Sequence, residues 1–464
     1  MKNTRYKVNL YSLFDFPKIE KSLEKMAAEG WMIVDAKGNF WKYERIEPRT
    51  LKFNVMFLPK VSALDPEPEE QSADLAEYAS KSGWKLAVSA SMMQIFYNEN
   101  PEAVPMETDP VVQVDTIHKT VKKNLLWTWI LLMAVSFMNV GLRFINFSDN
   151  AVKFLTDELQ LILVLSWFVI GLESLFHIAS YYIWYKKAKR EAENGEFIQP
   201  RSNMTAYYSI LVILLTLSMY LTFAMFENSG WHIAVWSIGY MVVIFGIVWF
   251  AIKMLKSIKM PAKYTLIIVY AIGLVVSFAL IGGLIHLILG NDHIDPHAAG
   301  TYEFNGHLRE YYLDEIPLRV EDMENVDYEN YSTRNESEST IFAAMSDITQ
   351  RSRIGERAPD LEYTIIDVKM PIFYDAIFND IWLRRDETHD EHVPEGHKSL
   401  YEEVDGTAWK ADRAYQLVSQ EFGGIDHYIL CYGDRIVEMV FYDFSPDEND
   451  KAVAGEKILG YKMP

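Results

Sequence analysis

The stretch EKMAAEGWMIVDAKGNFWKYER, residues 24–45, contains a helix end, a strand, a turn and a second strand. Apolar residues recur at helical spacing over residues 18–29. Gly30 fits the position after a helix, where a left-handed backbone costs glycine little. Residues 31–34 then form an apolar strand, and the Gly and Asn of DAKGN favour a tight turn before a returning strand at 40–45.

The same pattern occurs a second time in EYASKSGWKLAVSASMMQIFYNE, residues 77–99. Gly83 and Trp84 stand 53 residues after Gly30 and Trp31, and each helix follows a strand-like run, YKVNLYS or LKFNVMFL. We therefore predict an N-terminal α+β domain over residues 1–117, built from a tandem βαββ repeat of ferredoxin-like type with both helices on one face of paired sheets.

Apolar residues concentrate in the middle of the chain. Half of the 464 residues are hydrophobic, yet the mean hydropathy is only −0.03. Five long runs carry the excess, and each is long enough to cross a hydrocarbon core. They predict an α-helical transmembrane bundle of five spans within residues 118–290, at 124–145, 159–185, 207–226, 231–252 and 264–290. Aromatic residues, Trp129 and Tyr181 among them, gather towards the ends of the runs, as interfacial anchors do.

The charge of the connecting loops predicts an orientation. Lys and Arg are abundant before the first run and after the second and fourth, and sparse in the other two loops. Positive-inside reasoning places the N-terminus in the cytoplasm, and an odd number of spans places the C-terminus outside the cell. The sequence thus predicts a multi-pass protein of the plasma membrane.

Residues 291–464 predict an acidic extracellular α+β domain. Their formal net charge is −22, against −4 for residues 1–117 and +6 for 118–290. This balance argues against direct binding of nucleic acid, because phosphates attract Lys and Arg. The runs YTIIDVKM, HYILCYG and DRIVEMVFYDF predict strands, the last two joined by a hairpin turn at Gly433. We expect a helix over residues 408–424 and a mobile acidic loop over 321–338.

Two intramembrane polar residues are the site candidates. Glu173 lies near the middle of the second run, and His177 follows four residues later on the same helical face. A carboxylate at membrane depth is costly and defaults to a functional hypothesis. The pair could relay a proton or hold a cation. The structural alternative is a neutral Glu173 that is hydrogen-bonded to His177 or to a neighbouring helix.

A histidine cluster in the C-terminal part is the other feature that invites a chemical interpretation. His389, His392 and His397 lie in HDEHVPEGH, which lacks the HExxH arrangement and contains Pro394. We interpret it as a solvated loop, with a weak zinc site or a metallohydrolase as the alternative. No catalytic residue, metal or cofactor is predicted, and the one cysteine, Cys431, allows no intrachain disulfide.

The N-terminal part resembles a known bacterial family. The stretches LEKMAAEGWMI, GNFWKYERIEPRTLKFNVMFLPK and GWKLAVSASMMQIFYNENPEAVPMETD, within residues 5–117, are similar to the family catalogued as domain of unknown function 2812. The resemblance implies a bacterial membrane protein in which spans follow this domain, and it favours a role in regulation. The family has no established catalytic residues, so none are carried over.

The leading hypothesis is a non-enzymatic sensor or regulatory protein that couples the extracellular domain to the cytoplasmic one. The alternative is a transporter or transport accessory that uses Glu173 and His177. The partners considered are the lipid bilayer, a cytoplasmic regulatory protein and further copies of the chain in a homo-oligomer.

Overall fold

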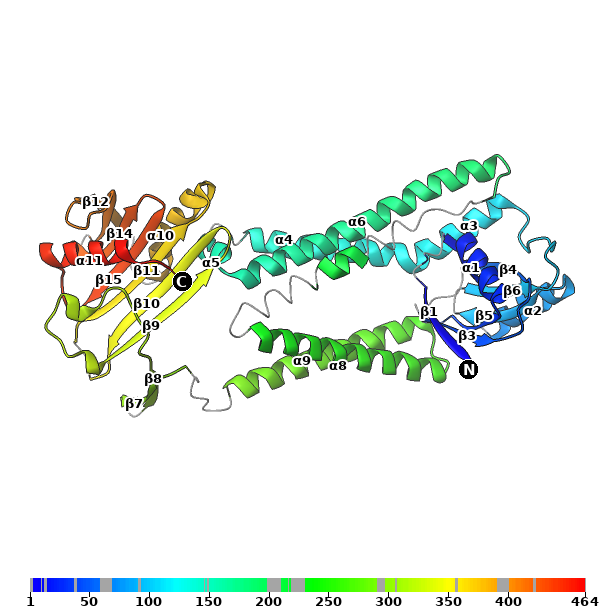
Figure 1. Ribbon diagram of the computed structural model, residues 1–464, viewed down its shortest axis with the longest axis horizontal. Helices are drawn as coiled ribbons and strands as arrows, with labels where there is room; N and C mark the ends of the chain where they lie inside the picture. The colour runs from blue at the N-terminus through cyan, green and yellow to red at the C-terminus, as the bar shows by residue number, and fades with distance from the viewer. Residues whose placement is uncertain are drawn as a thin grey trace. The chain divides into compact units, whose positions relative to one another are not determined.

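The protein contains two compact α+β units. The computed structural model describes residues 3–9, 11, 15–36, 40–58, 69–90, 93–145, 147, 150–197, 210–215, 217, 230–289, 297–304, 307–354, 358–389, 400–419 and 423–463. The N-terminal unit comprises Met1–Asn139 and Ser166–Leu287, and the C-terminal unit comprises Val140–Leu165 and Ile288–Pro464. Figure 1 shows the elements of each unit in sequence colours.

The N-terminal unit begins with two βαββ repeats. The first is β1 (Thr4–Val8), α1 (Phe16–Ala28), β2 (Trp31–Asp35) and β3 (Phe40–Arg45), and the second is β4 (Lys52–Phe57), α2 (Glu69–Lys81), β5 (Lys85–Ala90) and β6 (Met93–Asn98). Each repeat forms its own three-stranded antiparallel sheet, in the orders β1-β3-β2 and β4-β6-β5. Strands β2 and β5 lie next to each other, so the two sheets adjoin without a shared ladder among the described strands.

Both helices end at the glycines that the sequence singles out. Gly30 and Gly83 have φ values of +85° and +78°, the left-handed region in which a Cβ would be strained. The tryptophan that follows differs between the repeats. Trp84 is buried and its indole N–H donates to the carbonyl of Val104 at 3.3 Å, whereas Trp31 is half-buried under the guanidinium of Arg45. The glycine that ends the helix therefore has the same conformation in both repeats, whereas the tryptophan that follows it has a different environment in each.

Helices beyond the repeats complete the core of this unit. Helix α3 (Pro110–Val121) starts at Asp109, whose carboxylate accepts the backbone N–H of Val111 at 2.8 Å. A π-helical turn, Lys122–Leu126, leads into α4 (Trp127–Ile145), and α6 (Glu158–Glu193) returns. Buried residues of α3 and of the last turns of α6 pack with α1 and β4 in one apolar cluster; they are Val114, Ile117, Val121, Tyr181, Trp184, Ala188 and Ala192.

Three helices of the described chain are long and apolar enough to cross a membrane, where the sequence predicts five. They are Trp127–Ile145, Glu158–Glu193 and Ile238–Ser257, the last within α8 (Gly230–Ser257). In α9 (Ala262–Leu289), the apolar stretch Lys263–Ala279 is shorter. Most of the predicted run 207–226 lies outside the described residues. Three helices thus have the length and the apolar composition that the prediction of membrane spans requires.

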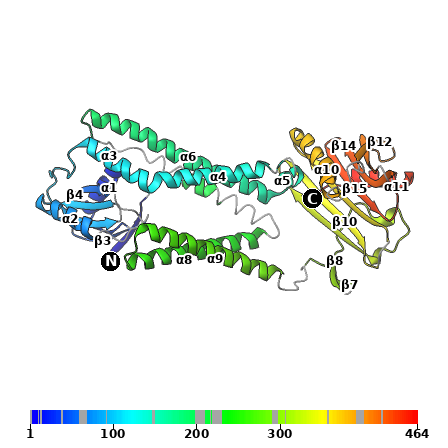
Figure 2. The ribbon, with the colours of Figure 1, turned by 180° about the vertical axis from the view of Figure 1, so that it is seen from behind.

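The C-terminal unit is built on a seven-stranded antiparallel sheet of order β12-β13-β14-β15-β11-β10-β9. Its strands are β9 (Tyr331–Ser339), β10 (Ala343–Ser352), β11 (Asp360–Val368), β12 (Leu400–Val404), β13 (Arg413–Ser419), β14 (Gly423–Tyr432) and β15 (Arg435–Tyr442). Helix α11 (Glu448–Gly460) packs on one face, and α10 (Tyr374–His389) with the short α5 (Ala151–Thr156) packs on the other (Figure 2). A separate hairpin, β7 (Gly300–Phe304) and β8 (His307–Tyr311), precedes the sheet. The predicted hairpin turn at Gly433, with φ +58°, is confirmed.

Two expectations for this unit are wrong. Residues 408–424 do not form a helix: they contain β13, which pairs with β12 on one side and β14 on the other. The neighbouring strands satisfy its backbone on both edges, and this outweighs the helical spacing of its apolar residues.

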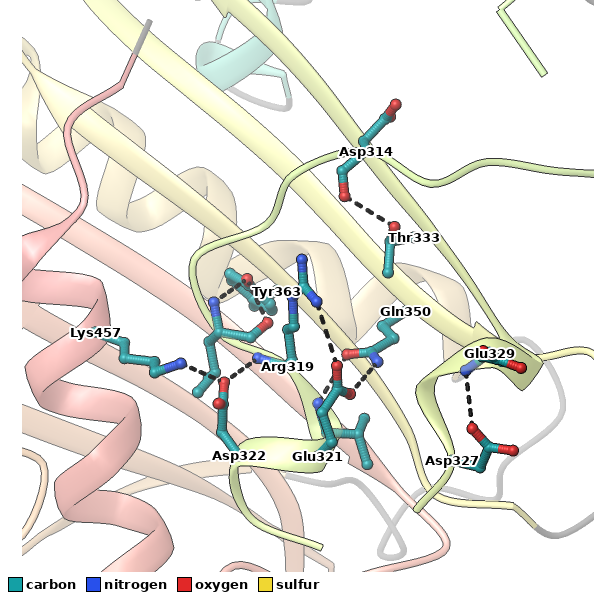
Figure 3. A network of polar contacts seen from close by, with 12 residues as sticks. Asp314, Arg319, Glu321, Asp322, Asp327, Glu329, Thr333, Gln350, Tyr363 and Lys457 are labelled. Atoms are coloured by element: carbon teal, nitrogen blue, oxygen red, sulfur yellow. Dashed lines mark hydrogen bonds and ion pairs between the residues drawn. The ribbon is translucent and has the colours of Figure 1, made fainter. Parts of the chain in front are cut away.

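The acidic segment 321–338 is also not a loop throughout. It contains two 3₁₀ turns, Val320–Asp322 and Tyr328–Asn330, and most of β9. Figure 3 shows why this segment is ordered despite its charge. Lys457 contacts Asp322 at 2.7 Å, and the side-chain amide of Gln350 donates to Glu321 at 2.8 Å. Gln350 of β10 and Lys457 of α11 thus provide a hydrogen bond and a positive charge to the acidic side chains of this segment.

Candidate functional site

Glu173 and His177 lie in contact on α6. The distance from His177 Nε2 to Glu173 Oε1 is 3.6 Å, and about a fifth of each side chain is exposed. The spacing of four residues on one helix brings the two groups together, as the sequence predicts. Because α6 is one of the three candidate spans, this ionisable pair follows a long apolar stretch, residues 161–172, in which Ser166 is the one polar side chain.

Aromatic rings continue from this pair towards the end of α6. The indole of Trp129, from α4, stacks on the His177 ring with centroids 5.3 Å apart and planes at 12°. Trp129 also contacts Tyr181, at a centroid distance of 6.5 Å. Tyr181 is one of the largest fully buried side chains of the protein. Trp129 and Tyr181 therefore pack against other rings of the N-terminal unit, beyond the interfacial role that the sequence suggests.

A histidine from outside the candidate spans completes the series. His118, on α3, forms a short hydrogen bond between its Nδ1 and the hydroxyl of Tyr181. Its ring also stacks on Tyr185, with centroids 4.1 Å apart. Burial, aided by the nearby charge of Lys122, lowers the pKa of His118 below its usual value. A neutral imidazole at this position suits stacking between two tyrosine rings.

We call the six side chains of Glu173, His177, Trp129, Tyr181, His118 and Tyr185 the aromatic ladder. It joins α4 and α6 to α3, and α3 and Tyr181 belong to the core of the βαββ repeats. Glu173 and His177 form an ion-pair contact and His118 and Tyr181 form a hydrogen bond, and the ring contacts of Trp129 link these two pairs. An indole ring that is stacked on its neighbours does not pass a proton along, so the route through Trp129 suits positioning better than proton relay.

A second feature, missed by sequence reasoning, lies in the connection between α4 and α6. This connection contains α5, whose residues Val152 and Leu155 are buried in the core of the C-terminal unit with Ile377 and Ile381 of α10. The backbone N–H of Val152 donates to the carboxylate of Asp380 at 2.7 Å.

The other end of α5 is held as well, because the hydroxyl of Thr340 donates to the carbonyl of Leu155. We call this arrangement of Val152, Leu155, Thr340 and Asp380 the α5 clamp. The apolar spacing of Val152 and Leu155 is the only local signal of it, and such spacing is too common in short loops to predict docking.

The C-terminal unit also holds a buried polar group that joins three strands. His427 of β14 is fully buried, and its Nε2 lies 2.8 Å from the hydroxyl of Tyr401 and 2.9 Å from Glu438 Oε1. These contacts of Nε2 connect β12, β14 and β15, so they help to fix the register of the sheet.

Most of the histidine cluster lies outside the part of the chain that the structure describes, so its interpretation as a solvated loop stays a prediction. His389 is the last residue of α10, and His392 and His397 lie outside the described residues. Among the residues that the structure describes, no group of three or more His, Cys, Asp or Glu side chains could hold a metal ion. Cys431 is buried, and burial raises the pKa of its thiol, as expected for a packing residue.

Comparison with known proteins covers the first quarter of the chain. No curated protein and no solved structure matches the sequence. Residues 15–131 match the family described as "Protein of unknown function (DUF2812)", a stretch that runs from the start of α1 to the first turns of α4 and includes Trp129 and His118 of the ladder. The resemblance expected from the sequence is therefore confirmed, and over residues 15–131 the chain is similar to the DUF2812 family.

Proposed function

We propose that this chain is a multi-pass plasma-membrane protein that couples an extracellular domain to a cytoplasmic one as a non-enzymatic sensor or regulatory protein. One observation carries the proposal: the helical hairpin α4–α5–α6 contributes buried residues to the core of each unit. Tyr181 and Trp184 of α6 are buried in the N-terminal unit, and Val152 and Leu155 of α5 in the C-terminal unit. A shift of this hairpin would therefore disturb the packing of both units.

The α5 clamp supports the proposed topology of five spans. If α4 crosses the membrane once, α5 lies on the side opposite to the βαββ repeats. Because α5 packs into the core formed by residues 343–436, that unit lies on the same side as α5. The number of crossings from α4 to the C-terminal unit is then odd. With α4, α6, α8 and α9 as spans, one more is required, and the apolar run 207–226 supplies it.

Labelling of introduced cysteines in intact cells tests this topology. The positions are Ile354 in the C-terminal unit and Tyr78 in the N-terminal unit, both about two-thirds exposed. The charge of the loops puts the C-terminal unit outside. A membrane-impermeant maleimide should then label Ile354→Cys in intact cells and Tyr78→Cys only after permeabilisation. Equal labelling of the two positions before permeabilisation would exclude the proposal.

The coupling mechanism requires two arrangements of the hairpin with different affinities for an external signal. The α5 clamp holds the hairpin in the C-terminal unit, and the ladder holds it in the N-terminal unit through Tyr181 and His118. A cytoplasmic regulatory protein would bind one arrangement of the N-terminal unit more tightly, and a homo-oligomer would allow two hairpins to shift together.

Hydrogen exchange in the full chain tests the coupling without a known ligand. Asp380→Ala weakens the clamp, and Asn379→Ala, at an exposed neighbour on the same helix, is the matched control. We expect Asp380→Ala to change the exchange of peptides that contain His118, in the other unit, while Asn379→Ala leaves it unchanged. If these peptides exchange at the same rate in the wild type and in both variants, the proposal of coupling is refuted.

A transporter or transport accessory is the second candidate function. The contact between Glu173 and His177 on a candidate span favours it, because intramembrane ionisable pairs commonly mark ion pathways. Glu173→Gln should then abolish proton- or cation-coupled flux in proteoliposomes, and Tyr181→Phe, which removes one hydroxyl at the far end of the ladder, should leave it in place. Undiminished flux in Glu173→Gln would dismiss the pair as a transport site.

A further inference from the structure

Two loops at one end of the C-terminal sheet expose large apolar side chains. The turn between β9 and β10 presents Ile341, which is 75% exposed, and the loop after β11 presents Met370 and Ile372, which are 41% and 81% exposed. We call these three side chains the apolar tip. Single exposed apolar residues are common on proteins, but three that come together from two loops call for a partner.

The apolar tip is held by the fold. The carbonyl of Phe342 accepts the backbone N–H groups of Lys369 at 2.9 Å and Met370 at 3.2 Å, which joins the two loops. Below them the rings of Phe342 and Phe373 meet edge to face, with centroids 5.4 Å apart. Both phenylalanines pack on the same buried core as α5 and α10. The two loops are therefore held in place by hydrogen bonds and ring packing, and they keep the three apolar side chains of the tip exposed.

The tip lies directly beside the ends of two candidate spans. Thr340, next to Ile341, donates its hydroxyl to the carbonyl of Leu155, and α6 begins three residues later, at Glu158. Phe154 of α5 contacts Phe144 in the last turn of α4, with ring centroids 5.8 Å apart. All of these residues belong to the C-terminal unit, so the tip and the span ends form one continuous part of it.

We propose that the apolar tip is a lipid-binding surface that seats the C-terminal unit on the bilayer crossed by α4 and α6. Phe144 and Ile145 at the end of α4 are themselves 57% and 69% exposed, and Phe144 contacts Phe154 of α5, so exposed apolar surface is present next to α5 as well as on the tip. Apolar side chains at the level of the lipid headgroups bind by removing their surface from water. The tip then restricts the angle between the sheet and the membrane helices, because docking of α5 alone would allow this angle to vary.

The inference rests on the proposed crossing of the membrane by α4 and α6, and the experiment distinguishes the two. Single cysteines are introduced at Ile372 in the tip, at Ile354 and at Leu165, in a full-length Cys431→Ala background in phospholipid nanodiscs. Ile354 is the matched control, because it is 68% exposed and follows the opposite end of β10 from Ile341. Leu165 is a half-exposed position on α6 and reports the crossing itself.

Each cysteine is labelled with an environment-sensitive fluorophore and challenged with nitroxide-bearing lipids and with aqueous iodide. The label at Ile372 should be quenched by headgroup-proximal nitroxides several times more strongly than the label at Ile354, with less access to iodide. If Leu165 is quenched by lipid and Ile372 behaves like Ile354, the tip proposal is overturned and the crossing stands. If Leu165 also escapes lipid quenching, both fail. Protection of Ile372 from iodide without lipid quenching would mean that protein, such as a second copy, covers the tip, and would overturn the proposal.

Discussion

The α5 clamp can be tested locally by removing one carboxylate. In Asp380→Ala, the N–H of Val152 loses the acceptor that lies 2.7 Å away, in a place where Val152 is fully buried and Asp380 is 1% exposed. A buried donor without a partner costs about 1–3 kcal/mol, and hydrogen bonds to charged groups are worth about 1.5–3 kcal/mol. We therefore expect the docking of α5 to weaken by about 2 kcal/mol.

Hydrogen exchange converts this energy into a measured ratio. Opening of α5 exposes its amides locally, and each 1.4 kcal/mol corresponds to about a tenfold change in an equilibrium constant. The protection of a peptide covering residues 150–157 in the full chain should fall by about 30-fold in Asp380→Ala. Asp380→Asn keeps an acceptor oxygen and should lose less protection, and Asn379→Ala should lose none.

The reasoning would be refuted by one clear result. If the protection of residues 150–157 in Asp380→Ala stays within about threefold of the Asn379→Ala control, the carboxylate contributes less than the roughly 1 kcal/mol assigned to the weakest such interaction. The burial of Val152 and Leu155 would then hold α5 without it.

Two further predictions concern the cores of the units. Burial raises the pKa of Glu20 to about 7 from 4.5, so the folded N-terminal unit keeps a proton that the unfolded chain loses. The free energy of unfolding should therefore fall by about 3 kcal/mol as the pH rises from 4.5 through 7. Thermal unfolding of Glu20→Gln from pH 5 to 8 should lack this dependence of stability on pH. In Gly455→Ala, the new Cβ would lie 2.0 Å from the carbonyl oxygen of Trp409. This clash should lower the free energy of unfolding, measured by chemical denaturation, by about 1–3 kcal/mol or more. Gly460→Ala, where the new Cβ meets open space, should lower it by less than about 1 kcal/mol.

Each of these predictions has its own contrary outcome. Parallel pH profiles for the wild type and Glu20→Gln would show that the proton on this carboxyl does not contribute to folding. Equal midpoints for Gly455→Ala and Gly460→Ala would mean that α11 can move away from the backbone at Trp409 at little cost.

Local signals in the sequence predict the parts of the fold that local physics decides. Gly30 and Gly83 end their helices because only glycine tolerates the backbone found there, and this holds whatever packs nearby. The contact between Glu173 and His177 is likewise fixed by helical geometry. Both could be predicted from a window of a few residues.

The parts that could not be predicted depend on partners distant in the chain. Tyr415 and Leu417 point to one face of β13 because β12 and β14 pair with it, whereas the spacing of Ala414, Leu417 and Val418 taken alone fits a helix. The aromatic ladder requires His118 and Trp129 to meet α6, and the clamp requires Asp380 to reach Val152. A single sequence contains no signal for such pairings.

The docking of α5 also determines the order in which the protein matures on the ribosome. Val152 emerges 228 residues before Asp380, so at about 5–20 residues per second the first hairpin waits roughly 10–45 s for the domain that will receive it. The late-synthesised domain cannot close its own interior until it captures this early segment. Its final folding step is therefore the docking of α5, and a fragment that begins after residue 290 would lack Val152 and Leu155 in its core.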